Sequence, residues 1–142
     1  MSKPDDTLNA LLRGELSAVE TYSMALKKAK TPHVIEVLTE CQQQHQARVQ
    51  KLTVLVTSAG GTPTTESGLW GSIAKAVEAG AVVLGEGSAI GSLKEGEDHG
   101  IELYKSEMKH LEGSALAAVQ NELFPAQEIT QKAISKLADK SQ

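Results

Sequence analysis

The sequence predicts an all-α fold, a four-helix bundle built from two helical hairpins joined by one long crossover. Apolar residues recur at spacings of three and four over four long segments, which is the pattern of amphipathic helices. Short links join the first segment to the second and the third to the fourth, whereas nearly thirty residues separate the second from the third. Aromatic residues make up only 3% of the 142 residues, so the core must be mostly aliphatic, which suits packed helices.

The first hairpin is predicted by two amphipathic segments, over about residues 7–29 and 32–58. A Thr-Pro pair at positions 31 and 32 separates them, because Pro favours the first turn of a new helix. The N-cap candidates of the first helix are Asp5, Asp6 and Thr7. The expected inward stripe of the second helix is Ile35, Leu38, Val49, Leu52 and Val56.

The second hairpin is predicted over about residues 88–111 and 114–138, and Pro125 is expected to kink its last helix because it removes a backbone donor. A short extra helix is expected in the crossover, over about residues 69–84. Trp70 would anchor this segment onto the bundle or take part in a dimer contact. Nine of the twelve glycines lie between residues 68 and 113, which weakens the helical pattern there.

A repeated motif, G-E-x-x-x-x-E-x-Y, is the most specific feature of the chain. It reads GELSAVETY over residues 14–22 and GEDHGIELY over residues 96–104. Glu15 and Glu97 occupy positions where the helical period requires an apolar residue. A buried carboxylate costs several kcal/mol unless a cation, a proton or a metal ion compensates its charge. We therefore expect both carboxylates to point into the bundle and to have such a partner.

The other residues of the motif are expected to point in different directions. Tyr22 and Tyr104 lie nearly two turns beyond the first glutamate of their motif, on the same face. In an antiparallel bundle each hydroxyl is expected to reach a carboxylate on a facing helix. Glu20 and Glu102 lie about 140° around the helix from the first glutamate, so they are expected to face solvent.

Two further polar pairs interrupt the inward stripes, at a spacing of three residues. Gln42 and His45 form Q-x-x-H on the second helix, and Gln127 and Thr130 hold the corresponding spacing on the fourth. These residues and the two motif glutamates all lie near the middle of their helices. We expect one connected polar cluster formed by Glu15, Gln42, His45, Glu97 and Gln127.

With these motifs the sequence resembles the rubrerythrin branch of the ferritin-like superfamily, which carries Gly-Glu followed at the same spacing by Tyr in both odd-numbered helices. It also resembles an uncharacterised bacterial family of ferritin-like four-helix bundles, whose first helix reads much like LNALLRGELSAVETY. The resemblance covers about residues 7–138. It implies a ferritin-like bundle with a di-metal site, built from one Glu on each of two helices and Glu-x-x-His on each of the other two.

The motif for that di-metal site is incomplete in this chain. A complete site needs six ligands, of which Glu15, His45 and Glu97 are present. Gln42 and Gln127 could offer only a neutral amide oxygen, which is a weak metal ligand. Two interpretations stay open. The residues bind iron or another divalent metal at low occupancy, or they form a buried network without a cofactor, in which the carboxylates bind Lys, Arg, Tyr or His45.

Our first hypothesis is a ferritin-like bundle of unknown biological role with a degenerate, metal-poor site and without catalytic residues, rather than an enzyme. One alternative is an iron-binding redox or storage protein that uses Glu15, His45 and Glu97. Another is a dimeric interaction or stress module. The net charge of −4 and the lack of a long basic run argue against a nucleic-acid partner. The longest weakly apolar run, residues 79–85, is too short to span a membrane.

The remaining residues indicate a single domain over residues 1–142 of a cytoplasmic protein, without a signal peptide at the N-terminus. Cys41 is the only cysteine, so an intramolecular disulfide is excluded, and we expect a small buried packing residue. His33, His99 and His110 lie off the inward stripes and are expected at the surface.

Overall fold

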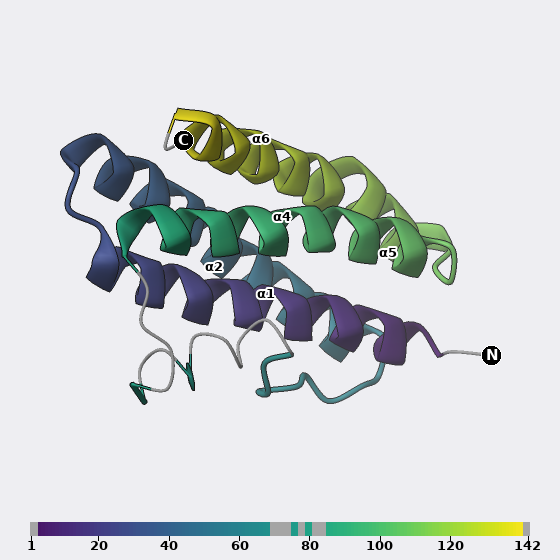
Figure 1. Cartoon of the computed structure of the whole chain (residues 1–142). Helices are drawn as coiled ribbons and strands as arrows, with labels where there is room; N and C mark the ends of the chain where they lie inside the picture. The colour runs from purple at the N-terminus through teal and green to yellow at the C-terminus, as the bar shows by residue number, and fades with distance from the viewer. Residues whose placement is uncertain (1–2, 69–74, 77–78, 81–84, 141–142) are drawn as a thin grey trace.

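A computed structural model describes residues 3–68, 75–76, 79–80 and 85–140 of the chain. These residues form α1 (Pro4–Lys28), α2 (Pro32–Ser58), α4 (Glu86–Met108), α5 (Gly113–Ala118), the π-helical segment η1 (Val119–Leu123) and α6 (Phe124–Lys140). No strand occurs among the described residues. Because α5, η1 and α6 follow one another without a break, the bundle has four main helices (Figure 1). The predicted all-α helical bundle is confirmed.

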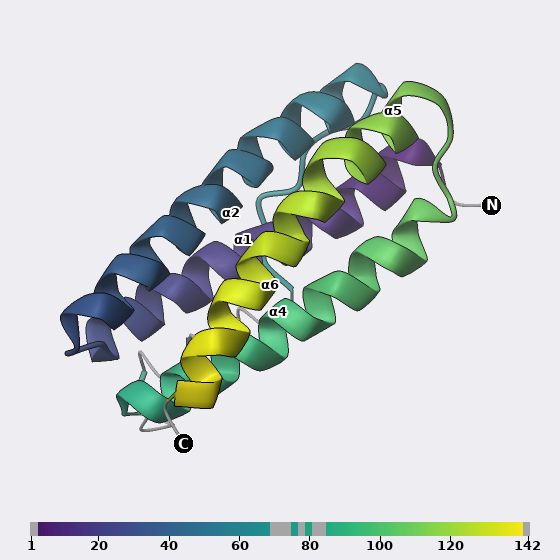
Figure 2. The same cartoon turned by 90° about the horizontal axis from the view of Figure 1, so that it is seen from above.

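The four helices are arranged as two antiparallel pairs. α1 packs along α2 and α4 packs along α6, while α1 also borders α4 and α2 borders α6 (Figures 1 and 2). The end of α2 and the start of α4 lie at opposite ends of the bundle (Figure 1). The two hairpins therefore place α1 antiparallel to α4, so that side chains at the middle of all four helices meet at the same level.

The first two helices begin at prolines. α1 starts at Pro4, earlier than expected, and Lys3 occupies the N-cap position without a side-chain cap hydrogen bond. Asp5 and Asp6, expected as N-cap candidates, instead lie in the first turn, where their charges favour the positive end of the helix dipole. α2 starts at Pro32 and ends at Ser58, as the sequence predicts.

A carboxylate from the second hairpin holds the link between α1 and α2. Oε2 of Glu86, the first residue of α4, accepts hydrogen bonds from the backbone N–H groups of Lys30 at 2.5 Å and Thr31 at 2.8 Å. Thr31 is the N-cap residue of α2 and Lys30 precedes it, so neither backbone N–H group has an acceptor within that helix. Glu86 thus fixes the start of α4 against the first hairpin.

The disturbance expected at Pro125 takes the form of a π-helical segment. Residues Val119–Leu123 are π-helical, and the backbone N–H of Phe124 donates to the carbonyl of Val119, five residues earlier. Pro125 has no N–H, so the carbonyl of Asn121, four residues earlier, lacks its α-helical donor. The wider turn accommodates this defect while α6 continues with Gln127 and Thr130 facing inward.

Two apolar clusters fill the bundle on either side of its middle. One is centred on Tyr22, Leu38, Leu93 and Ile134. The other is formed by Leu8, Leu11, Leu12, Leu52, Val56, Tyr104, Leu111, Val119 and Leu123. Buried polar residues separate the two clusters. Of the expected stripe on α2, Leu38, Leu52 and Val56 are buried, but Ile35 is 39% exposed and Val34 is buried in its place.

The short helix expected over residues 69–84 lies mostly outside the described residues, and so does Trp70. Among the helices that the structure describes, none combines the length and apolar character needed to cross a membrane. Cys41 is buried, as expected. His33, His99 and His110 are exposed, also as expected.

Candidate functional site

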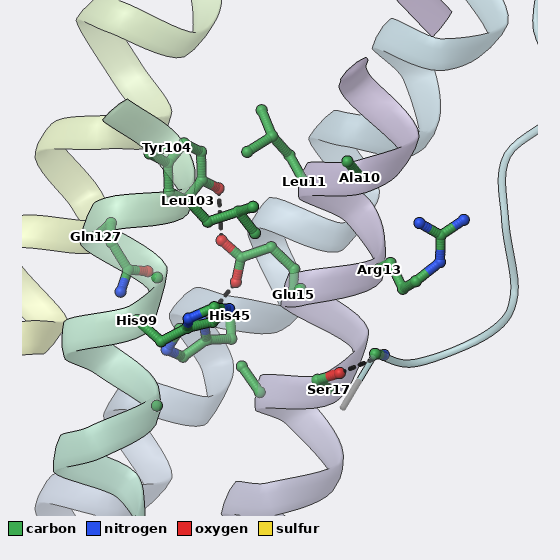
Figure 3. Close-up of a pocket in the computed structure, with 15 residues that line it drawn as sticks. Ala10, Leu11, Arg13, Glu15, Ser17, His45, His99, Leu103, Tyr104 and Gln127 are labelled. Carbon is green, nitrogen blue, oxygen red and sulfur yellow. Dashed lines mark hydrogen bonds and ion pairs between the residues drawn. The ribbon is translucent and has the colours of Figure 1, made fainter. Parts of the chain in front are cut away.

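The polar layer between the two apolar clusters contains two acidic and two basic side chains. Glu15 of α1, His45 and Arg48 of α2, and Glu97 of α4 are all buried, with at most 3% of each residue exposed. Gln127 and Thr130 of α6 are buried beside them. Each of the four main helices therefore contributes to one central cluster, and Figure 3 shows Glu15, His45, Tyr104 and Gln127 converging in it.

His45 lies between the two carboxylates. Its Nδ1 is 2.5 Å from Oε1 of Glu15, and its Nε2 is 2.8 Å from Oε2 of Glu97. A ring nitrogen that faces an ionised carboxylate donates a proton to it, and, against the effect of burial, the charges and hydrogen bonds of Glu15 and Glu97 raise the pKa of His45. These contacts favour an imidazole that is protonated on both nitrogens and positively charged. His45 is thus a buried histidine held by both glutamates, one of the two arrangements that the sequence left open.

Arg48 is the second buried cation, one turn after His45 on α2. Its Nε donates to Oε2 of Glu15 at 2.8 Å, and its Nη2 donates to Oε1 of Gln127 at 3.1 Å and Oγ1 of Thr130 at 3.3 Å. Nη2 also lies within 3.0 Å of both ring nitrogens of His45. One atom cannot lie along the in-plane direction of both nitrogens, so the guanidinium lies over the imidazole face.

Glu97 accepts most of its hydrogen bonds from neutral donors. Its Oε1 accepts from Nε2 of Gln127 at 2.8 Å and from Oγ1 of Thr130 at 2.9 Å. Gln127 Nε2 is also 3.0 Å from the backbone carbonyl of Glu97. Because every one of these contacts comes from a donor, they suit the ionised carboxylate, which only accepts. Glu15, Glu97, His45 and Arg48 then balance as two negative and two positive charges.

The two motif tyrosines exchange hydrogen bonds between the halves of the bundle. Tyr22 of α1 donates to Oε2 of Glu97 at 2.5 Å, and Tyr104 of α4 donates to Oε2 of Glu15 at 2.5 Å. The expectation that each hydroxyl reaches a carboxylate on a facing helix is confirmed. Tyr22 also packs against the His45 ring, with the ring centroids 5.1 Å apart.

These contacts shift the pKa values of the cluster strongly. Burial alone raises the pKa of Glu15, but the charges of His45 and Arg48 outweigh burial and lower it to about 2. Burial tends to lower the pKa of His45, and the charge and hydrogen bond of Glu15 reverse this, so the pKa is raised. Burial beside carboxylates raises the pKa of both Tyr22 and Tyr104 well above the usual value. The tyrosines therefore stay neutral donors.

Two expected placements need correction. Gln42 is half-buried and lies apart from the cluster, because its Nε2 donates to the carbonyl of Val19 at 3.0 Å and to Oγ of Ser23 at 2.7 Å. Glu20, expected in solvent, is half-buried, and its Oε2 has no hydrogen-bond partner among the described residues. Glu102, expected to be equivalent, is 73% exposed, as predicted.

A constant separation of eighty-two residues explains why Gln42 lies outside. Glu15 and Glu97 are separated by this number, and so are Tyr22 and Tyr104. The same separation relates His45 to Gln127 and Arg48 to Thr130, all of which face the centre. The polar pair on α2 is therefore His45 and Arg48, one helical turn beyond the Gln42–His45 pair expected from the sequence.

Arg48 is a member of the central cluster that the sequence motifs did not predict. Its position was readable in the sequence, because it lies three residues after His45 and eighty-two residues before Thr130. A long basic side chain on a mostly polar helix is ordinarily a surface residue. Only the packing shows that its guanidinium turns inward, where it binds Glu15.

The cluster as arranged does not fit a metal ion. The described residues contain no group of three or more His, Cys, Asp or Glu side chains arranged to hold one. Arg48 is always protonated, and its buried Nη1 is a spare donor without a partner among the described residues. A metal ion needs free lone pairs, whereas this site offers an extra N–H group and already holds two cations between its carboxylates.

A cavity of about 150 Å³ reaches the cluster from the surface between α1 and α4. Its lining includes the exposed residues Arg13 and His99 and the buried residues Glu15, His45 and Tyr104. Figure 3 shows the Arg13 side chain pointing away from α4, and Glu15, His45 and Tyr104 facing one another between the helices. Glycines on both helices border it, including Gly14 and Gly100. One carboxylate of the cluster is therefore accessible to a small molecule.

In a comparison with protein families, residues 4–110 match the model of the domain of unknown function DUF2383. This range includes α1, α2 and α4, and with them both motif glutamates, both motif tyrosines, His45 and Arg48. Neither the curated proteins nor the solved structures contain a significant match to the chain.

Proposed function

The chain belongs to the DUF2383 family, and we propose that this member is a ferritin-like bundle in which a buried pair of cations takes the place of a di-metal centre. Such a protein has no redox or ferroxidase chemistry at its centre. It serves as a metal-independent bundle that binds other molecules, not as an enzyme.

The observation that carries this proposal is the position of Arg48. Its Nε is 2.8 Å from Glu15 and its Nη2 is within 3.3 Å of both Gln127 and Thr130, so the guanidinium touches residues of α1, α2 and α6. In ferritin-like di-metal proteins the metal ions lie among one Glu from each of two helices and Glu-x-x-His from the other two. Here a fixed positive charge already compensates the carboxylates.

The separation of eighty-two residues identifies which positions would have to change to restore the metal ligands. His45 and Gln127 are equivalent, and Arg48 and Thr130 follow them at the spacing of Glu-x-x-His. The variant His45→Glu, Arg48→His, Gln127→Glu and Thr130→His would therefore complete the ligand set together with Glu15 and Glu97.

Metal analysis of both proteins, purified without a His tag and dialysed against Fe(II) or Zn(II), tests the proposal. The unaltered protein should hold far less than the roughly two ions of a complete site, and the fourfold variant should gain metal. Adding Glu15→Gln to the variant should lower its metal content again. Stoichiometric, tight metal binding by the unaltered protein would support the alternative of a redox or storage protein that uses Glu15, His45 and Glu97.

A further inference from the structure

The cavity between α1 and α4 has the dimensions of a small-molecule site. Its volume is about 150 Å³, and cavities of roughly this size hold a molecule such as benzene in other proteins. Gly14 lets α1 approach α4, because a Cβ atom there would lie 2.9 Å from Cδ2 of Leu103. Gly100 makes room for Gln127 of α6, because a Cβ atom there would lie 2.5 Å from its Nε2. The two helices therefore approach closely around a space that stays open.

The two ends of the cavity differ in chemistry. Its lining includes the exposed residue His99, and its walls include the apolar Leu11 and Leu103. Its inner end is formed by buried polar groups, among them Glu15. A ligand would thus bury an apolar body between the helices and place a polar atom at the inner end.

Glu15 offers an acceptor at that inner end. Its Oε2 accepts hydrogen bonds from Arg48 and Tyr104, whereas the contact of Oε1 among the described residues is with Nδ1 of His45. A carboxylate oxygen can accept two hydrogen bonds, so Oε1 retains capacity for one more donor. Glu15 is 3% exposed, and a donor that reaches it would be shielded from water, which strengthens the hydrogen bond.

We propose that this cavity binds a small, neutral, mostly apolar molecule with one hydrogen-bond donor, of the size and polarity of a phenol. A cationic ligand is disfavoured, because it would add positive charge to a balanced cluster that contains His45 and Arg48. An anionic ligand is disfavoured by the carboxylate of Glu15. A neutral donor satisfies Oε1 and leaves the charge balance unchanged.

The proposal rests on the proposed function only in requiring a Glu15 that is free of metal, so the test uses protein treated with a chelator. Calorimetric titration compares phenol with toluene, which has the same shape without the donor, and with benzylammonium, which is a cation. Phenol should bind about tenfold more tightly than toluene, as expected for a hydrogen bond to a charged acceptor, and benzylammonium should bind more weakly than phenol. Equal affinities for phenol and toluene would overturn the role of Glu15.

Two variants locate the site. Ala10 lines the cavity, and Ala10→Leu should reduce phenol affinity at least about tenfold by filling the space. Ala47→Leu makes the same change at an exposed position of α2 and should leave phenol affinity unchanged. In the unaltered protein, phenol should shift the amide NMR signals of Gly14 and Gly100 and leave that of Ala47 in place. Binding that survives Ala10→Leu, or shifts confined to other helices, would overturn the proposal whatever the metal analysis shows.

Discussion

The two hairpins place the same side-chain positions at the centre of the bundle but fill them with different charges. The first hairpin contributes Glu15 together with both cations, His45 and Arg48. The second contributes Glu97 together with two neutral residues at the equivalent positions, Gln127 and Thr130. The net charge that each half buries is therefore opposite in sign, positive for the first half and negative for the second.

This difference makes each half depend on the other. Among the described residues, the carboxylate of Glu97 forms its ion pair with His45 of the other hairpin, whose Nε2 lies 2.8 Å away. The surplus positive charge of the first half is compensated only when α4 packs against it. A bundle assembled from two copies of one hairpin would bury an excess of charge of one sign at its centre, which is costly. The charge distribution thus favours one assembled bundle over two independent hairpins.

The largest effect is expected when the two cations of the first half are replaced by the neutral residues that the second half has at the equivalent positions. The double variant His45→Gln, Arg48→Thr leaves the two carboxylates buried without a cation. We expect a loss of about 5 kcal/mol or more in the free energy of unfolding, since breaking one buried ion pair costs about 3–5 kcal/mol. Urea unfolding of metal-free protein at neutral pH measures the effect.

Two comparisons control this experiment. Adding Glu15→Gln and Glu97→Gln to the double variant removes the excess negative charge and should recover part of the lost stability. Lys51→Thr removes a cation from the same helix, but Lys51 is 44% exposed and pairs with Glu122 at 3.3 Å on the surface. That change should cost only about 0–1 kcal/mol. A double variant as stable as Lys51→Thr would show that the central charges are solvated.

The fold was largely readable from the sequence, because the helical period and the positions of Pro32 and the glycines determine where long helices start and end. Glu15 and Glu97 were also recognisable, since a carboxylate in an apolar stripe has few explanations other than a buried partner. The partner itself was not. A short i, i+3 pattern allows two registers on α2, Gln42–His45 and His45–Arg48, and only packing against α6 selects the second.

The pH dependence of stability should sharpen the comparison, because Glu15 and His45, two central groups whose pKa values shift on folding, both belong to the first half. The pKa of Glu15 falls from 4.5 to about 2 on folding, so its contribution is full above pH 4.5 and is lost as the pH falls toward 2. The pKa of His45 is raised above 6.5, so its contribution is full below pH 6.5 and is lost as the pH rises through the folded-state value. Stability should therefore be greatest between about pH 4.5 and 6.5.

Between pH 4.5 and pH 2 the free energy of unfolding is expected to fall by about 3 kcal/mol, because folding lowers the pKa of Glu15 from 4.5 to about 2. Urea midpoints measured from pH 2 to 9 provide the profile. Glu15→Gln should flatten the acid limb and His45→Gln should flatten the limb above pH 6.5. If Glu15→Gln leaves the slope of stability against pH unchanged on the acid side, the acid loss does not come from Glu15. If His45→Gln leaves the slope above pH 6.5 unchanged, the loss there does not come from His45.

The smallest effect concerns the tyrosines, where the two halves are most alike. Tyr22→Phe and Tyr104→Phe each remove one hydroxyl that donates at 2.5 Å to a carboxylate of the opposite half. Each should cost about 1.5–3 kcal/mol, the range for hydrogen bonds to charged groups. The Tyr22 hydroxyl also interacts with the thiol of the buried Cys41, so its loss should be larger, but by less than about 1 kcal/mol because a thiol is a weak hydrogen-bonding group.

Urea unfolding of the two single variants and of the double variant measures these costs. Because both hydroxyls bind one connected cluster, the costs should not add, and the double variant should differ from their sum by at least about 0.5 kcal/mol. Strict additivity would mean that Glu15 and Glu97 are held independently. In that case His45 would not couple the two halves, and their opposite charges would compensate each other only through the surrounding protein and not through a shared network.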